Sequence, residues 1–160
     1  MSKTVTPKQA IKISKQIKAF GKTIVLAGGV FDILHLGHIR FLEKAKNQGN
    51  FLLVLLESDQ NAKKRKGENR PIHIQKNRAL VLSSLQSVDY VLLLPEMTTD
   101  QEYDKLISQL QPSVIATTKG DVFVKRKERQ AKLINGKVAY VIERIKDQST
   151  TKMEKLITNS

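Results

Sequence analysis

The 160-residue chain carries 28 Lys and Arg against 15 Asp and Glu, and its formal net charge of +13 would attract polyanions of any kind, from nucleic acid and anionic lipid to nucleoside triphosphates. Hydrophobic residues make up 40% of the sequence and cysteine is absent, which predicts a folded protein and excludes disulfides, thiolate catalysis and cysteine-containing zinc sites. No apolar run approaches the roughly 20 residues of a membrane span and no signal-peptide core is found near the N-terminus, so we expect a cytoplasmic protein without a membrane span.

The first elements predicted along the chain are a helix and a βαβ unit. Residues 7–20 place apolar side chains at helical spacing, with Pro7 able to begin the helix and Gly21 to end it, so residues 1–21 are expected to form an N-terminal helical extension. There follow a strand at 22–29 (KTIVLAGG), a helix at 36–48 and a strand at 51–56 (FLLVLL). Because both strands are continuously apolar, they are expected to be buried in a parallel sheet.

The same alternation continues along the chain. We expect a helix near 75–87, a strand at 89–94, a helix near 100–110, a strand near 112–117, a basic helix near 124–134, a strand at 137–142 and a final helix at 150–157. Strands alternating with helices predict an α/β fold, here a Rossmann-like, doubly wound parallel sheet of about five strands in an α/β/α sandwich. No repeat or linker divides the pattern, so residues 1–160 are expected to form a single domain.

The segment from Gly28 to His38, GGVFDILHLGH, lies where the first strand ends and the next helix begins. In doubly wound sheets ligands bind at the carboxyl ends of the strands. The glycines let the backbone approach a ligand closely, and the helix N-terminus offers free N–H groups to phosphate. Three interpretations of His35 and His38 are open: a metal site with Asp32 as the one carboxylate nearby, local capping and packing, or binding of a phosphate chain through hydrogen bonds.

This segment resembles the signature of the cytidylyltransferase-like nucleotidyltransferases, in which an HxGH motif follows the first strand of a Rossmann-like sheet. The resemblance implies that His35 and His38 are catalytic: they contact the triphosphate and stabilise the transition state as pyrophosphate leaves. It also places the residues in front of the histidines in the nucleotide-binding site. Those residues are Gly29, Val30, Phe31 and Asp32.

A second motif resembles the family's C-terminal signature, R-T-x-G-I-S-T-T, which opens the last helix. The matching residues are Arg144, Ser149, Thr150 and Thr151, and the sequence departs from the signature at Ile145, Asp147 and Gln148. The resemblance implies that Arg144 is catalytic and neutralises phosphate charge, while the three hydroxyl groups bind the nucleotide. The alternative is an ordinary helix cap with a surface arginine.

Basic residues crowd the loop expected after the second strand, SDQNAKKRKGENRP at residues 58–71. In relatives a lysine of this flexible loop closes over the triphosphate, and Lys66, followed by glycine, resembles it as a catalytic residue. Lys64 or Arg65 would help to bind the phosphates. The alternatives are a solvated loop and a nucleic-acid patch.

Three further positions complete the comparison with the family's pattern. Arg78 matches an arginine before a V-D-x-V strand, and it is expected either to bind nucleotide or acceptor or to form a surface salt bridge. Gly120 and Asp121 resemble a turn near the base and ribose, although Lys119 stands one position late for that motif. His73 has no counterpart, and we expect it to be exposed or half buried.

Within the family, the sequence looks most like heptose 1-phosphate adenylyltransferases and glycerol 3-phosphate cytidylyltransferases. The resemblance implies transfer of AMP or CMP from ATP or CTP, with Mg²⁺, to a small phosphorylated acceptor, and a homodimer. Archaeal-type FMN adenylyltransferases share the first motif and are one alternative. The other is a non-catalytic nucleotide or nucleic-acid module, against which the 5% aromatic content argues because single strands bind by base stacking.

Overall fold

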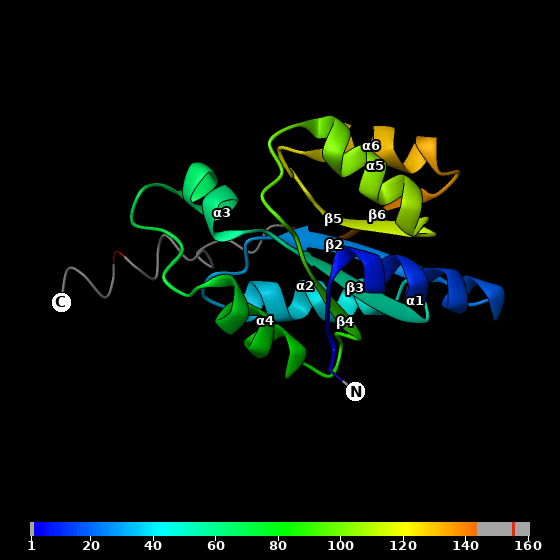
Figure 1. Cartoon of the computed structure of the whole chain (residues 1–160), viewed down its shortest axis with the longest axis horizontal. Coiled ribbons are helices and arrows are strands. Elements are labelled where there is room, and N and C mark those ends of the chain that lie inside the picture. The colour runs from blue at the N-terminus through cyan, green and yellow to red at the C-terminus, as the bar shows by residue number, and fades with distance from the viewer. Residues whose placement is uncertain (1, 144–154, 156–160) are drawn as a thin grey trace.

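The structure is a computed structural model that describes residues 2–143 and 155 (Figure 1). Its centre is one parallel sheet with the strand order β1-β4-β3-β2-β5-β6. The strands are β1 (Thr4–Val5), β2 (Ile24–Gly29), β3 (Phe51–Leu56), β4 (Tyr90–Leu93), β5 (Val114–Lys119) and β6 (Lys137–Glu143). The helices are α1 (Pro7–Ala19), α2 (Leu36–Lys46), α3 (Asp59–Lys66), α4 (Gln75–Ser83), α5 (Asp100–Leu110) and α6 (Val124–Leu133). The predicted α/β fold with a Rossmann-like parallel sheet is confirmed.

The sheet has one strand more than the five expected, because β1 was not predicted. This strand pairs with β4 through Thr4↔Val91 and Val5↔Leu92. Two residues are too few to show any periodicity, so β1 is recognised only by its pairing with β4, which is distant in the sequence. Directly after it, the Thr6 hydroxyl accepts a hydrogen bond from the Gln9 backbone N–H at 3.4 Å and the Gln9 side chain accepts one from the Thr6 N–H at 2.8 Å, a capping box that begins α1.

Helices cover both faces of the sheet. Helices α2 and α4 pack on one face, and α1, α5 and α6 on the other (Figure 1). Alternate residues of β3 show why both faces are buried: Leu53 and Leu55 pack under the second group of helices, and Leu52, Val54 and Leu56 under the first. The continuous apolar run FLLVLL is therefore a central strand between two cores.

Strand β2 lies in the middle of the sheet. It pairs with β3 along its whole length, from Ile24↔Phe51 to Gly29↔Leu56, and with β5 on its other side. The chain runs outward from β2 through β3 and β4, and then returns to build β5 and β6 beyond the opposite edge of β2. The strand order thus reverses between β2 and β5, which is where open α/β sheets bind ligands.

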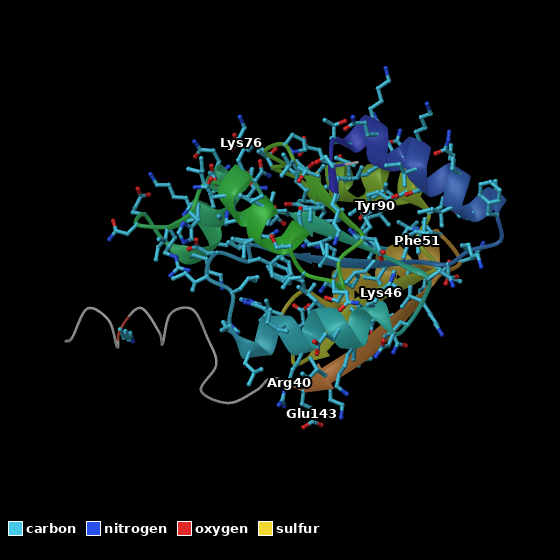
Figure 2. All side chains as sticks on the ribbon, turned by 90° about the horizontal axis from the view of Figure 1, so that it is seen from below. Arg40, Lys46, Phe51, Lys76, Tyr90 and Glu143 are labelled. Atoms are coloured by element: carbon cyan, nitrogen blue, oxygen red, sulfur yellow. The ribbon has the colours of Figure 1, made fainter. Side chains whose placement is uncertain are left out.

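The amino ends of β3 and β4 are closed by a charged side chain from α2. The amine of Lys46 lies 5.6 Å from the centre of the Phe51 ring, which stacks on Tyr90 at 6.4 Å (Figure 2). The same amine contacts the carboxylate of Asp89 at 2.6 Å. This end of the sheet is filled by packing, and the opposite, carboxyl end carries the glycines and histidines.

The segment expected as a loop at 58–71 contains helix α3. Its N-cap is Ser58, whose hydroxyl accepts a hydrogen bond from the Asn61 N–H at 3.1 Å. The helix has no apolar stripe, which is why the periodicity did not predict it. The helix expected at 150–157 lies outside the described residues. Within residues 2–143 and 155, no helix is long and apolar enough to cross a membrane.

Candidate active site

Two histidines meet at the start of α2, beyond the end of the central strand β2. The backbone of Phe31 adopts a left-handed conformation (φ 47°) after the terminal glycines of β2. His35 is the N-cap of α2, and its Nδ1 accepts a hydrogen bond from the Gly37 N–H at 3.1 Å. The rings of His35 and His38 stack with centroids 3.8 Å apart and planes inclined by 25°. Local capping, one of the three interpretations, is therefore real for His35, but it leaves Nε2 of that ring available for a ligand.

Burial and nearby positive charge keep both imidazoles neutral at physiological pH. Burial lowers the pKa of His38 to about 4, with smaller contributions from His35 and Lys66 that exceed the opposing effect of the Ile33 backbone. Burial, followed by the charge of Lys66, also lowers the pKa of His35. Nδ1 of His38 is buried and has no hydrogen-bond partner among the described residues. Neutral imidazoles at a helix N-terminus can donate hydrogen bonds to a ligand.

Lys66, the last residue of α3, lies close enough to the histidine pair for its charge to act on both rings. The sequence predicts that this lysine acts on the same phosphates as the histidines, and the effect of its charge on the pKa of both rings agrees with that prediction. Lys64 lies elsewhere: its amine contacts Glu96 at 2.7 Å, and both side chains are exposed. Lys66 therefore remains a candidate phosphate-binding residue, whereas the amine of Lys64 is paired with Glu96.

Asp32 supports the histidine loop from inside the protein. Its carboxylate contacts Nε of Arg70 at 2.6 Å and accepts hydrogen bonds from the backbone N–H groups of Ile72 and His73. Burial alone would raise the pKa of Asp32, but the two backbone hydrogen bonds and the charge of Arg70 outweigh it and hold the pKa below its usual value. The side chain is 1% exposed. Asp32 therefore links the loop before His35 to the segment after α3.

Arg78 holds the other side of the same loop. Its guanidinium donates to the backbone carbonyls of Val30, His73 and Glu57 and pairs with Asp59 at 2.7 Å. Arg78 is 1% exposed and its salt bridge reaches a partly exposed Asp59, so in this structure the guanidinium supports the loop and is neither on the surface nor open to a ligand. Its carbonyl partners lie at the ends of β2 and β3, where the ligand crevice begins.

A cavity of about 180 Å³ opens beside the histidine loop, beneath α5 and α6. Its floor is apolar, formed by side chains of the sheet and α5. Its polar wall consists of Glu57, Tyr103, Asp121, Arg126, Lys127 and Gln130. The cavity reaches Gly28 and Gly29, so it is continuous with the carboxyl end of β2 at the place where the strand order reverses.

Asp121 forms part of this wall and is fixed within its own turn. Its carboxylate accepts hydrogen bonds from the Thr117 hydroxyl and the Lys127 amine, each at 2.6 Å, and from the Phe123 N–H at 2.9 Å. Burial opposes ionisation, but these three donors outweigh it and lower the pKa of Asp121. Gly120 has a left-handed backbone (φ 78°) that permits the turn. The predicted turn is thus placed at the cavity, and it leads into α6.

A group of residues, of which the sequence had pointed only to Arg65, joins the cavity wall to α3. We call Glu57, Arg65, Tyr103, Phe123 and Arg126 the Phe123 cluster. Glu57, 4% exposed, pairs with Arg65 at 2.9 Å and accepts a hydrogen bond from the Tyr103 hydroxyl at 2.8 Å. The guanidiniums of Arg65 and Arg126 lie 4.9 and 4.7 Å from the centre of the Phe123 ring. Burial and the charge of Glu57 raise the pKa of Tyr103 to about 12, so its hydroxyl stays protonated.

Three predictions remain: the exposure of His73, the C-terminal motif and a metal at the histidine pair. His73 is exposed, as expected. Arg144, Ser149, Thr150 and Thr151 lie outside the described residues. Within the described part of the chain, no group of three or more His, Asp or Glu side chains could hold a metal ion, and the carboxylate of Asp32 faces Arg70. The metal interpretation of the histidine pair therefore has no ligand set among these residues.

The fold and the site define a Rossmann-like α/β domain with a ligand crevice at the end of its central strand and two histidines at a helix N-terminus. A family model described as cytidylyltransferase-like matches residues 26–158. The chain belongs to this cytidylyltransferase-like family, as the HxGH segment predicted.

Relatives and solved structures agree with this assignment. The bifunctional protein HldE of Wolinella succinogenes is 40% identical over 153 residues, which cover 93% of this chain and 30% of that protein. HldE of Nitratiruptor sp. is 39% identical, over 87% of this chain and 28% of that protein. The chain thus spans less than a third of the length of these relatives.

Two crystal structures have the same fold. The lipopolysaccharide core biosynthesis protein of Thermoplasma volcanium is 29% identical with a TM-score of 0.63, and the match covers 79% of this chain and all of that one. Pantoate-beta-alanine ligase of Francisella tularensis, at 16% identity and a TM-score of 0.64, covers 97% of this chain and 76% of its own. The second likeness concerns the fold alone.

Proposed function

We propose that this chain is a nucleotidyltransferase that moves AMP or CMP from a nucleoside triphosphate to a small phosphorylated acceptor and releases pyrophosphate. The observation that carries the proposal is the stacked pair His35 and His38, with Lys66 beside it, at the end of the central strand. In such a reaction an acceptor phosphate oxygen attacks the α-phosphorus in line. The bond between that phosphorus and the oxygen bridging to the β-phosphate breaks, and pyrophosphate leaves with the electron pair.

The histidines are suited to this step because they are neutral donors in a partly dry site. Nδ1 of His35 accepts the Gly37 N–H, so the ring proton is on Nε2, from which it can be donated to a phosphate oxygen. The low pKa of His38 means that the ring becomes cationic only when negative charge arrives. A triphosphate brings that charge, and its growth on the leaving oxygens is the change the rings stabilise.

Lysine and arginine supply the fixed positive charge. Lys66 acts on the same phosphates as the histidines, and we propose Arg144, Ser149, Thr150 and Thr151 as further phosphate-binding residues on the basis of the motif they form. Mg²⁺ would come as part of the triphosphate substrate and would supply charge neutralisation, since the described residues offer no group of three metal-ligating side chains. No covalent enzyme intermediate is needed, because catalysis here consists of positioning and charge stabilisation.

The substrate pair we favour is ATP with a sugar 1-phosphate. The resemblance to heptose 1-phosphate adenylyltransferases and the HldE relatives support this choice over CTP with a polyol phosphate. The family resemblance also underlies our proposal of a homodimer in the cytoplasm. Light scattering on the purified protein tests the first, and fractionation of the producing cells tests the second.

The experiment is a panel. The purified protein is incubated with ATP or CTP, Mg²⁺, and one of three acceptors: a sugar 1-phosphate, glycerol 3-phosphate or FMN. We expect pyrophosphate release with ATP and the sugar phosphate. Release with FMN alone would assign the FMN adenylyltransferase alternative. Absence of release with every pair, while triphosphate still binds, would reject a nucleotidyltransferase and leave a nucleotide-binding module.

A further inference from the structure

We infer that Arg65 is a positioning residue: it holds α3 against the Phe123 cluster and thereby places Lys66 beside the histidine pair. The role of Lys66 toward a ligand rests on the proposed function. The placement itself is a property of the free protein and is tested without any substrate.

The side chain of Arg65 joins α3 to three other elements. Its guanidinium pairs with Glu57 at the end of β3 at 2.9 Å. It donates to the Tyr103 hydroxyl of α5 at 3.4 Å, and it lies 4.9 Å from the centre of the Phe123 ring at the start of α6. One planar cation thus makes an ion pair, a hydrogen bond and a cation–π contact, a combination that lysine cannot reproduce.

The N-terminal end of α3 is anchored by Asp59, which pairs with the buried Arg78 at 2.7 Å, so Arg65 acts on the C-terminal end that carries Lys66. The buried side chains of the helix are Asn61 and Ala62. The Asn61 amide donates to Glu57 at 3.2 Å and to Tyr103 at 3.1 Å, so it joins the same cluster. In the second half of the helix, the pairs of Lys63 with Glu68 and of Lys64 with Glu96 are exposed. Exposed pairs contribute little, and a helix without an apolar stripe depends on tertiary contacts for its position.

The cluster is built to hold the guanidinium. Glu57 is buried, so losing its cation would leave a carboxylate without its ion pair inside the protein. The Phe123 ring lies between two guanidiniums, because Arg126 approaches it at 4.7 Å. Arg126 also lies 4.9 Å from the Tyr103 ring and pairs with Asp100 at 3.1 Å, which anchors α6 to α5. Helix α3 therefore docks on a surface that is itself held by ring contacts and an ion pair of Arg126.

This docking couples the cavity to the histidine pair. Glu57, Tyr103, Phe123 and Arg126 line the cavity, so an occupant of the cavity contacts the surface on which Arg65 rests. Lys66 follows Arg65 directly, and its charge lowers the pKa of both histidines. The helix whose Arg65 packs on residues of the cavity wall is thus the helix that carries Lys66.

The test compares Arg65→Ala with Lys63→Ala, which removes the same charge from the same helix but only an exposed pair. The readout is a titration of the imidazole resonances by two-dimensional NMR on the free protein. In Arg65→Ala we expect the pKa values of His35 and His38 to rise, because Lys66 no longer lies beside them. In Lys63→Ala they should match the wild type. Arg65→Lys, which can keep the Glu57 pair but not the planar stack, should give intermediate values.

Kinetics supply the second readout. With the acceptor found by the panel, Arg65→Ala should lower kcat by about tenfold or more, because a lysine misplaced by an ångström no longer meets the phosphates. A rise in the KM of the acceptor alone, with kcat and the histidine pKa values unchanged, would overturn the inference and make Arg65 a ligand-binding residue. Histidine pKa values in Arg65→Ala equal to those of Lys63→Ala would overturn it as well.

A milder variant covers the case in which Arg65→Ala does not fold. Phe123→Leu keeps an apolar side chain but removes the aromatic face, and it should shift both histidine pKa values in the same direction by less. If a folded Phe123→Leu protein has the same histidine pKa values as the wild type, the contact between Arg65 and the Phe123 ring does not position α3. If the wild type releases no pyrophosphate with any acceptor, the proposed function fails, while the titration still decides the position of α3.

Discussion

The Phe31 ring occupies the space that a side chain at Gly29 would need: a Cβ atom built on Gly29 would lie 2.9 Å from Cε2 of that ring. That ring is 5% exposed and meets the His38 ring edge-on, with centroids 5.2 Å apart. The absence of a side chain at Gly29 thus leaves room for the ring against which His38 packs. The same loop is held from below by Asp32 and Arg78.

Gly29→Ala should therefore impair catalysis through a displaced Phe31. We expect kcat to fall about 10- to 100-fold and stability to drop by about 1–3 kcal/mol, because a buried ring must move. Pyrophosphate release and urea unfolding measure the two effects. Gly28→Ala is the matched control for stability, since its Cβ would make an ordinary 3.8 Å contact with Leu55. Equal unfolding midpoints for the two variants would contradict the contact argument.

His38→Ala should lower turnover by about two to three orders of magnitude at saturating triphosphate, the usual loss when one charge-stabilising donor is removed. Initial rates of pyrophosphate release check this. His73→Ala serves as the control, because the His73 side chain is exposed and only its backbone takes part in the loop. Normal turnover of a folded His38→Ala protein would remove the histidine pair from the mechanism.

The burial of His38 predicts a pH dependence of stability. Its pKa falls from 6.5 to about 4 on folding, so between these values the unfolded chain binds more protons than the folded one. Stability should therefore rise with pH across this window and be lost as the pH falls through it, by at most about 3 kcal/mol. Urea unfolding from pH 4 to 7 measures the slope, which His38→Gln should reduce. An unchanged slope in that variant would show that the ring is not buried as described.

The buried pair of Asp32 and Arg70 predicts an asymmetric response to mutation. Their side chains are 1% and 5% exposed, so Asp32→Ala or Arg70→Ala leaves one buried charge behind and should cost about 3–5 kcal/mol of stability. The double variant should cost less than the sum of the two. Lys119→Ala, which breaks an exposed pair with Glu143, should stay within about 1 kcal/mol of the wild type. Additive losses in the double-mutant cycle would argue against a direct interaction.

The regular elements were largely predictable from the sequence. FLLVLL at 51–56 coincides with β3, and the predicted helices at 7–20 and 100–110 agree with α1 and α5 to within a residue. Burial on both faces requires continuous apolar residues in a strand, and burial on one side requires helical spacing, so both patterns are local. The HxGH segment was equally local, and its place at a helix N-terminus was correctly predicted.

The supports of the site were not predictable in the same way. Asp32 meets Arg70 across 38 positions, and Glu57 meets Tyr103 across 46. No spacing rule connects such residues, because the fold alone brings them together. Helix α3 escaped prediction because the residues DQNAKKRK bury almost nothing. Glu57 carried one faint signal, a carboxylate directly after an apolar strand that ends at the ligand edge.

The central position of β2 has a consequence for how the protein opens. Strands at the edges of a sheet lose their hydrogen bonds first in local fluctuations, whereas strands flanked on both sides exchange their amide hydrogens only when the whole domain unfolds. Strand β2 lies between β3 and β5, and the loop that carries the histidines follows its carboxyl end. The amides of Val25 to Ala27 should therefore be among the slowest to exchange with deuterium, and the histidine pair should keep its shape in a molecule whose two-residue edge strand β1 has already frayed.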